Sequence, residues 1–134
     1  MIVLDTSVLS PVFRRRSAAA EPEVVDTFRR LVSSDQPLVM PGIVYQEMLT
    51  GVKSPAQHRL LSAALSGFPL VLAAREHHVR AAEIARSCRA AGVATSTIDC
   101  LIAAHALRRG WSLFSLDSDF ERIARVTGLR LFRG

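Results

Sequence analysis

Four acidic side chains stand where a carboxylate requires a chemical explanation. Asp5 and Asp117 each follow a short apolar run, and Asp99 opens an alanine-rich segment with helical spacing. Glu47 is the charged member of an otherwise apolar helical face, by the i, i+3, i+4 rule. An unpaired carboxylate on such a face is costly to bury, so a cation is the expected partner. Oxygen ligands of this kind suit Mg²⁺ or Mn²⁺.

Each of these acids also has a purely structural explanation. Asp5 suits the N-cap of the segment after it, and one acid of the pair Asp117 and Asp119 suits the cap of the next helix. The helix dipole favours Asp99 in a first turn, and Glu47 suits the edge of an apolar stripe. Capping of the next helix explains one of the acids Asp117 and Asp119, but not both. We therefore assign Asp117 to the site and Asp119 to its rim or to the cap.

Short apolar runs alternate along the chain with stretches of helical periodicity. The runs cover residues 2–4, 38–40, 70–72, 113–114 and 129–132. Prolines stand where helices or strands should begin, and glycines where helices should stop. These punctuating residues are Pro22, Pro41, Pro55, Pro69, Gly92, Gly110 and Gly128. The alternation predicts an α/β fold with a parallel sheet covered by helices on both faces.

A parallel sheet of this kind places ligand sites at the carboxyl ends of its strands. Asp5 and Asp117 follow strands directly, so they belong to this edge. The helix that contains Asp99 should end at Gly110, just before the strand that begins near Trp111. Its start lies about 12 residues back, roughly 18 Å at 1.5 Å per residue, which returns Asp99 to the same edge. Four carboxylates gathered there would repel one another, and divalent cations would relieve that repulsion.

Composition indicates a folded chain that suits an anionic partner. The chain has 134 residues, which fits one domain, and 49% of them are hydrophobic. Its 17 basic side chains outnumber 12 acidic ones, and all but Lys53 are arginines. Arginine suits phosphate recognition, although a basic surface also serves solubility alone. Cys88 and Cys100 are expected to be buried reduced thiols, in a cytoplasmic protein with no signal or membrane-spanning segment.

Four sequence elements, in order, resemble the PIN-domain family and within it the VapC-type toxins. The first is the opening strand with its acid, and the second is a glutamate helix that carries a glycine one turn later. The third is an acid with an alanine-rich helix, and the fourth is a Thr-x-Asp-x-x-Phe element in which Ser115 replaces threonine. In this chain they read Met1–Leu9, Val44–Gly51, Asp99–Ala106 and Ser115–Phe120. Each element alone is weak evidence, but four at family-like spacing make a specific pattern.

This resemblance implies a single domain over residues 1–134, with three α/β/α layers and a sheet of four or five parallel strands. It also implies a Mg²⁺- or Mn²⁺-dependent endoribonuclease whose acids are Asp5, Glu47, Asp99 and Asp117. A hydroxyl of Ser7 or Ser115 would orient a ligand or a water molecule. The implied partners are RNA, a second copy of the chain, and a cognate antitoxin through which the complex contacts DNA indirectly.

Other residues are assigned from the sequence itself. Arg14, Arg15 and Arg16 are candidates for a rim that binds RNA phosphates, or else form a solvated turn. The four histidines show no zinc-ligand spacing and are interpreted as surface or core residues.

Several other classes of protein share parts of this pattern. A haloacid-dehalogenase-type phosphatase needs a second aspartate where Ser7 stands, and a receiver-like binding module needs an acid pair and a late lysine. Both requirements are unmet. A PIN-fold nuclease that cuts structured DNA, and a degenerate PIN domain that serves as a scaffold, remain as alternatives.

Overall fold

Five short parallel strands form one twisted sheet in the computed structural model, which describes residues 1–13 and 21–134. The strand order is β3-β2-β1-β4-β5, so the first strand of the chain occupies the centre. The strands are β1 (Ile2–Leu4), β2 (Leu38–Pro41), β3 (Leu70–Val71), β4 (Ser112–Phe114) and β5 (Arg130–Leu131). The predicted α/β class is confirmed, with the larger of the two expected strand numbers.

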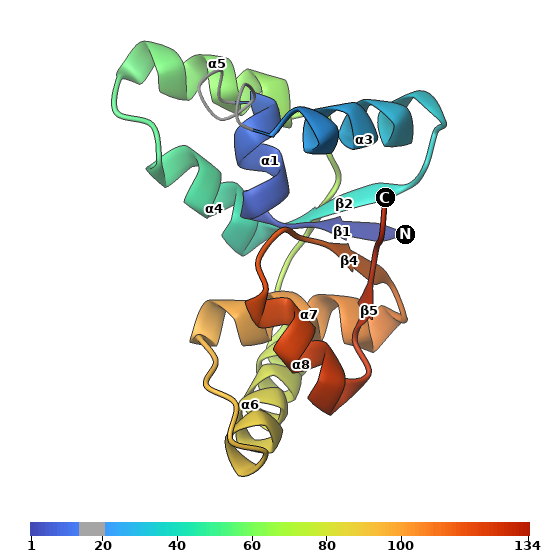
Figure 1. The fold of residues 1–134 in the computed structure, drawn as a ribbon. Coiled ribbons are helices and arrows are strands. Elements are labelled where there is room, and N and C mark those ends of the chain that lie inside the picture. The colour runs from blue at the N-terminus through green and yellow to red at the C-terminus, as the bar shows by residue number, and fades with distance from the viewer. Residues whose placement is uncertain (14–20) are drawn as a thin grey trace.

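Helices cover both faces of this sheet (Figure 1). On one face lie α1 (Thr6–Phe13), α3 (Pro22–Ser33), α4 (Gly42–Thr50) and α5 (Pro55–Leu65). On the other face lie α6 (Arg75–Ala90), α7 (Thr97–Arg109) and α8 (Asp119–Thr127). The predicted three-layer arrangement is therefore present. Within the described residues, none of the helices combines the length and apolar character needed to cross a bilayer.

Burial follows strand position. All three residues of β1 are buried, because strands flank it on both sides and helices cover both of its faces. The edge strands β3 and β5 are only partly buried. Cys88 and Cys100 are buried free thiols in the helical layer of α6 and α7, as the sequence predicted.

The expected start and stop residues occupy the ends of helices. Pro22 and Pro55 are the first residues of α3 and α5, where a missing N–H costs nothing. Gly110 ends α7 in the left-handed conformation, with φ of 66°, which glycine adopts without strain. This sharp stop allows β4 to begin two residues later and fixes the return of α7 along the sheet.

Candidate active site

The register between β1 and β4 places two residues of the candidate site, Asp5 and Ser115, side by side. Leu4 pairs with Phe114, so the residues that follow them, Asp5 and Ser115, leave the sheet together. The backbone N–H of Asp5 donates to the carbonyl of Phe114 at 3.1 Å and closes this edge. From here the chain enters α1 after β1 and leads into α8 after β4, at the same edge of the sheet but on opposite faces of it (Figure 1).

Two serine hydroxyls hold the carboxylate of Asp5, which is only 6% exposed. The Oγ atoms of Ser7 and Ser115 each lie 2.7 Å from Asp5 Oδ2, and 3.1 Å from each other. Backbone N–H groups of Leu116 and Asp117 donate to these two serine oxygens, at 2.9 and 3.0 Å. Both serine donations end on Oδ2, which leaves Oδ1 as the Asp5 oxygen available to a ligand.

Three further carboxylates meet beside Asp5. Asp99, Asp117 and Asp119 each contribute one oxygen to a group in which all these atoms lie within 4.8 Å of one another. Asp99 sits in the first turn of α7, where its backbone N–H donates to the N-cap hydroxyl of Ser96 at 3.0 Å. The sequence argument that α7 returns this acid to the strand ends is thus supported by the geometry.

Electrostatics in this group are unfavourable for an ionised carboxylate. The pKa of Asp99 is raised to about 6, chiefly by burial, against a smaller opposing effect of the Ser96 hydrogen bond. The negative charges of Asp117, Asp5 and Asp119 contribute to this rise. Asp99 therefore interacts electrostatically with Asp5 as well as with Asp117 and Asp119. A bound cation would reverse the direction of this pKa shift.

The last two acids occupy different places. Asp117 Oδ1 accepts the backbone N–H of Asp119, the first residue of α8, at 2.9 Å. Asp119, which the sequence assigned to the rim of the site or to the cap, joins the carboxylate group and also forms an ion pair with Arg122. The Asp-x-Asp spacing alone could not decide between the two.

Glu47 approaches the site from α4. Its Oε1 accepts a hydrogen bond from the hydroxyl of Thr6 at 3.1 Å, and Thr6 directly follows Asp5. The contact ties α4 to the start of α1, at the residue that follows Asp5 in the chain. Glu47 does not share the 4.8 Å group formed by the other three acids. Nothing in the sequence pattern predicted this role of Thr6.

The donor set fits a divalent cation. Mg²⁺ binds oxygens at about 2.1 Å, so two ligands of one ion lie no more than roughly 4.2 Å apart, close to the spacing of this group. The ligands are all carboxylate oxygens, and the negative charges of Asp117, Asp5 and Asp119 contribute to the raised pKa of Asp99. An ion would need only small side-chain movements to bind these acids.

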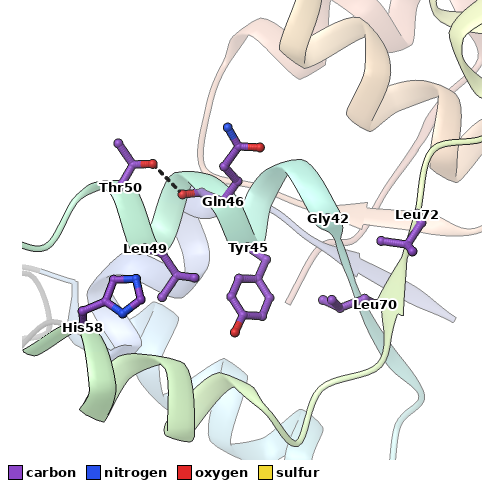
Figure 2. Close-up of a pocket in the computed structure, with 8 residues that line it drawn as sticks. All are labelled: Gly42, Tyr45, Gln46, Leu49, Thr50, His58, Leu70 and Leu72. Atoms are coloured by element: carbon purple, nitrogen blue, oxygen red, sulfur yellow. Dashed lines mark hydrogen bonds between the residues drawn. The ribbon is translucent and has the colours of Figure 1, made fainter. Parts of the chain in front are cut away.

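A second hollow, of about 520 Å³, lies away from this chemistry. Figure 2 shows Tyr45 and Leu49 projecting from α4 toward α5 and toward Leu70 on the edge strand β3. The Tyr45 hydroxyl lies 3.1 Å from the Ser62 hydroxyl. The described lining is mainly apolar and has no carboxylate, so this hollow is not a second metal site.

Two sets of predicted residues are not placed by this geometry. Arg14, Arg15 and Arg16, proposed from the sequence as a phosphate-binding rim, lie in residues 14–20, outside the described part of the chain. The four histidines, which the sequence assigned to the surface or the core, are not members of the carboxylate group.

Comparison with known proteins identifies the class to which this fold and site belong. Residues 2–126 match the family profile of the PIN domain. The chain therefore belongs to the PIN-domain family.

Within that family the chain is a VapC-type member. It is 36% identical over 133 residues to Ribonuclease VapC11 of Mycobacterium tuberculosis, and the alignment covers 97% of this chain and 96% of the relative. Two solved structures share the fold at lower identity. FitAcB from Neisseria gonorrhoeae matches with a TM-score of 0.79 and 19% identity, over 99% of this chain and 97% of that one. VapBC2 from Rickettsia felis, bound to a DNA fragment from its promoter, matches with a TM-score of 0.78 and 20% identity, over 98% of each chain.

Proposed function

We propose that this protein is a Mg²⁺- or Mn²⁺-dependent endoribonuclease that acts in the cytoplasm as the toxin of a toxin–antitoxin pair. The observation that carries the proposal is the meeting of Asp99, Asp117 and Asp119 oxygens within 4.8 Å, beside the buried Asp5. The similarity to Ribonuclease VapC11 supports RNA as the substrate. Carboxylates that hold a divalent ion suit hydrolysis of a phosphodiester, because such an ion can generate hydroxide from water at neutral pH.

Asp5 and Asp99 would hold the principal ion, with Asp117, Asp119 and Glu47 completing the site directly or through water. When bound, such an ion lowers the pKa of a water molecule and stabilises the leaving oxygen. The other side chains of the site orient the carboxylates that would hold the ion. Ser7 and Ser115 fix the Asp5 carboxylate through Oδ2, and the backbone N–H groups behind them fix the serines. Thr6 holds Glu47 toward the same edge, where it can bind a water.

The serine pair provides a test of this orienting role. We expect Ser115→Ala to lower cleavage activity or metal affinity by about 10- to 100-fold, the usual effect of losing a group that orients a metal ligand. Ser115→Thr, the residue commoner in the family element, should retain activity. The measurement is the initial rate of RNA cleavage against Mn²⁺ concentration. An alanine variant that matches the parent over the whole titration would show that Asp5 needs no such support.

The central experiment removes the metal. Purified protein incubated with total cellular RNA and Mg²⁺ should produce discrete fragments, and an excess of EDTA should abolish them. Restoring Mg²⁺ should recover the activity, and sequencing the new 5′ ends should map the cut sites. Parallel reactions with flap DNA test a structured-DNA nuclease instead. Cleavage that survives EDTA would contradict the metal-dependent proposal, and absence of cleavage of any nucleic acid would favour a scaffold.

The proposed protein partners follow from the same family membership. The Rickettsia felis structure holds VapBC2 on promoter DNA, which supports an antitoxin partner for this chain. In this proposal the antitoxin makes the DNA contact, so DNA binding by this chain is indirect. We also propose that the chain forms a homodimer. Mass measurement in solution, of the chain alone and of the chain co-expressed with a candidate antitoxin, tests both partners.

A further inference from the structure

A row of charged residues runs along α8, away from the carboxylate group. Asp119 begins the helix, Arg122 follows one turn later, and Arg125 one turn after that. Residues three apart occupy neighbouring positions on one helix face, with about 4.5 Å of rise between them. The row therefore starts inside the carboxylate group and continues as two arginines.

Both arginines are placed to meet a ligand from solvent. The Arg122 guanidinium contacts Asp119 Oδ1 and is 47% exposed. Arg125 is exposed and has no acidic partner among the described residues. Glu121, the other acid of this helix, is paired at 3.4 Å with Arg133. Asp119 and Glu121 are therefore each paired with an arginine, which leaves Arg125 as the α8 arginine without an acidic partner among the described residues.

We propose that Arg122 and Arg125 bind consecutive backbone phosphates of the RNA as it leaves the cleavage site. This inference rests on the proposed ribonuclease function and names the surface that positions its substrate. The carboxylate group itself repels a polyanion, so the attraction must come from its surroundings. Arginine's planar fork pairs with phosphate oxygens in a bidentate manner, and α8 offers two such forks beside the acids.

The contact with Asp119 links this row to the metal site. Asp119 has two competing cationic partners, the Arg122 guanidinium and an ion held with Asp99 and Asp117. An ion that draws Asp119 toward the carboxylate group weakens the ion pair and frees Arg122 for a phosphate. Removal of the Arg122 charge should therefore strengthen Mn²⁺ binding while it weakens RNA binding. A merely structural role predicts neither change.

The test measures RNA binding separately from cleavage. A fluorescein-labelled single-stranded RNA is titrated with the full-length protein, with Ca²⁺ in place of Mg²⁺ and a gel to confirm that the RNA is intact. The variants are Arg122→Gln, Arg125→Gln, their double, and the double lysine variant. Arg29→Gln, an exposed arginine on α3 in the opposite helical layer, is the matched control.

We expect the double glutamine variant to raise Kd about tenfold and to lower the slope of log Kd against log salt by about 1.4, since each single-strand phosphate contact contributes roughly 0.7. The double lysine variant should restore most of the slope, and Arg29→Gln should match the parent. Mn²⁺ titration of Arg122→Gln should show equal or tighter binding than the parent. Thermal unfolding checks that each variant is folded. The unfolding temperatures should match that of the parent, because an exposed ion pair contributes little to stability.

A double variant with the parent's Kd and salt slope overturns the inference, as does a parent protein that does not bind the RNA. An equal loss in Arg29→Gln also overturns it, because the effect would then reflect net charge alone. A parent that binds RNA but does not cleave it with Mg²⁺ or Mn²⁺ contradicts the proposed function instead. The two failures are therefore distinguishable.

Discussion

Replacing Asp99 with asparagine is expected to lower Mg²⁺-dependent RNA cleavage by about 10³-fold, equivalent to about 4 kcal/mol in the activation barrier. Asparagine keeps the shape and the backbone bond to Ser96, so α7 should still start at the same place. The change removes one negative ligand from the group that Asp99 shares with Asp117 and Asp119. The measurement is single-turnover cleavage of a mapped substrate. Activity within tenfold of the parent would exclude Asp99 as a metal ligand.

The same variant should be more stable than the parent when no metal is present. The folded-state pKa of Asp99 is raised to about 6 from 3.8, so ionising this group disfavours the folded state. Parent stability therefore falls as pH rises from about 4 through 6 and stays lowered above it. Asp99→Asn should escape this loss and gain about 1 kcal/mol at pH 7 in EDTA, after allowance for solvent screening. Added Mn²⁺ should reverse the order by stabilising only the parent, as ligand linkage requires.

Opposite effects on activity and metal-free stability distinguish a ligand from a structural acid. Asp35→Asn is a suitable control, because Asp35 lies in the turn after α3 with φ of 55°, which asparagine also tolerates. This variant should keep both the activity and the Mn²⁺-dependent stabilisation. A loss of stability in Asp99→Asn without metal would mean that this carboxylate contributes to the fold itself.

The sequence predicted the fold well because its signals are local. Ile2–Leu4 is a buried strand in both prediction and structure, since a wholly apolar run that ends at an acid has few other uses. Gly110 and Gly128 end their helices with positive φ, as glycine's lack of a side chain allows. The apolar run at residues 129–132 yields only the short strand Arg130–Leu131, because an edge strand has a partner on one side alone.

The sequence predicted the sheet edge at which the acids lie, but not the side-chain hydrogen bonds that hold them there. Topology carries Asp5 and Asp99 to one edge, and topology follows from the alternation of strands and helices. Side-chain hydrogen bonds between residues far apart in sequence have no such local signal. The bond from Thr6 to Glu47 spans 41 residues, and that from Ser115 to Asp5 spans 110. These contacts depend on strand register and helix packing, which a single sequence does not specify.

Arg122 illustrates the same limit from the substrate side. The sequence drew attention to the compact run Arg14–Arg16, because adjacent charges are easy to see in a linear pattern. Arg122, which contacts an acid of the carboxylate group, is an isolated arginine three residues after Asp119. Helix geometry places it there, because residues three apart are neighbours on one helix face. Candidate phosphate-binding residues near the acids can therefore be found by i+3 spacing as well as by charge density.

The second large effect concerns acid stability and a histidine that the proposed chemistry does not use. His105 is 1% exposed in α7, and its Nδ1 has no hydrogen-bond partner among the described residues. Its ring lies 4.5 Å from that of His77 on α6. The pKa of His105 is lowered to about 4, chiefly by burial and to a smaller extent by the nearby His77 and His78. The pKa of His77 is also lowered, by burial and by Arg108.

We expect His105→Phe to protect the protein against acid. Because the folded-state pKa of His105 lies below its unfolded value of 6.5, its contribution to stability is complete above pH 6.5 and is lost as pH falls toward 4. Between pH 7 and 5 that loss is about 2 kcal/mol for the parent, and the phenylalanine variant should lack it. Phenylalanine keeps an aromatic ring against His77 and removes the unpartnered nitrogen. The measurement is urea unfolding at pH 7, 6 and 5.

The difference between variant and parent isolates His105 from the carboxylate group. Over the same interval the raised pKa of Asp99 works in the opposite direction, since its protonation at lower pH stabilises the folded state. Both proteins share that contribution, so it cancels when their unfolding free energies are subtracted. His58→Gln, which removes an exposed histidine on α5, controls for loss of a histidine as such. If His105→Phe and the parent lose stability in parallel from pH 7 to 5, then His105 accepts its proton without opening the contact between α6 and α7.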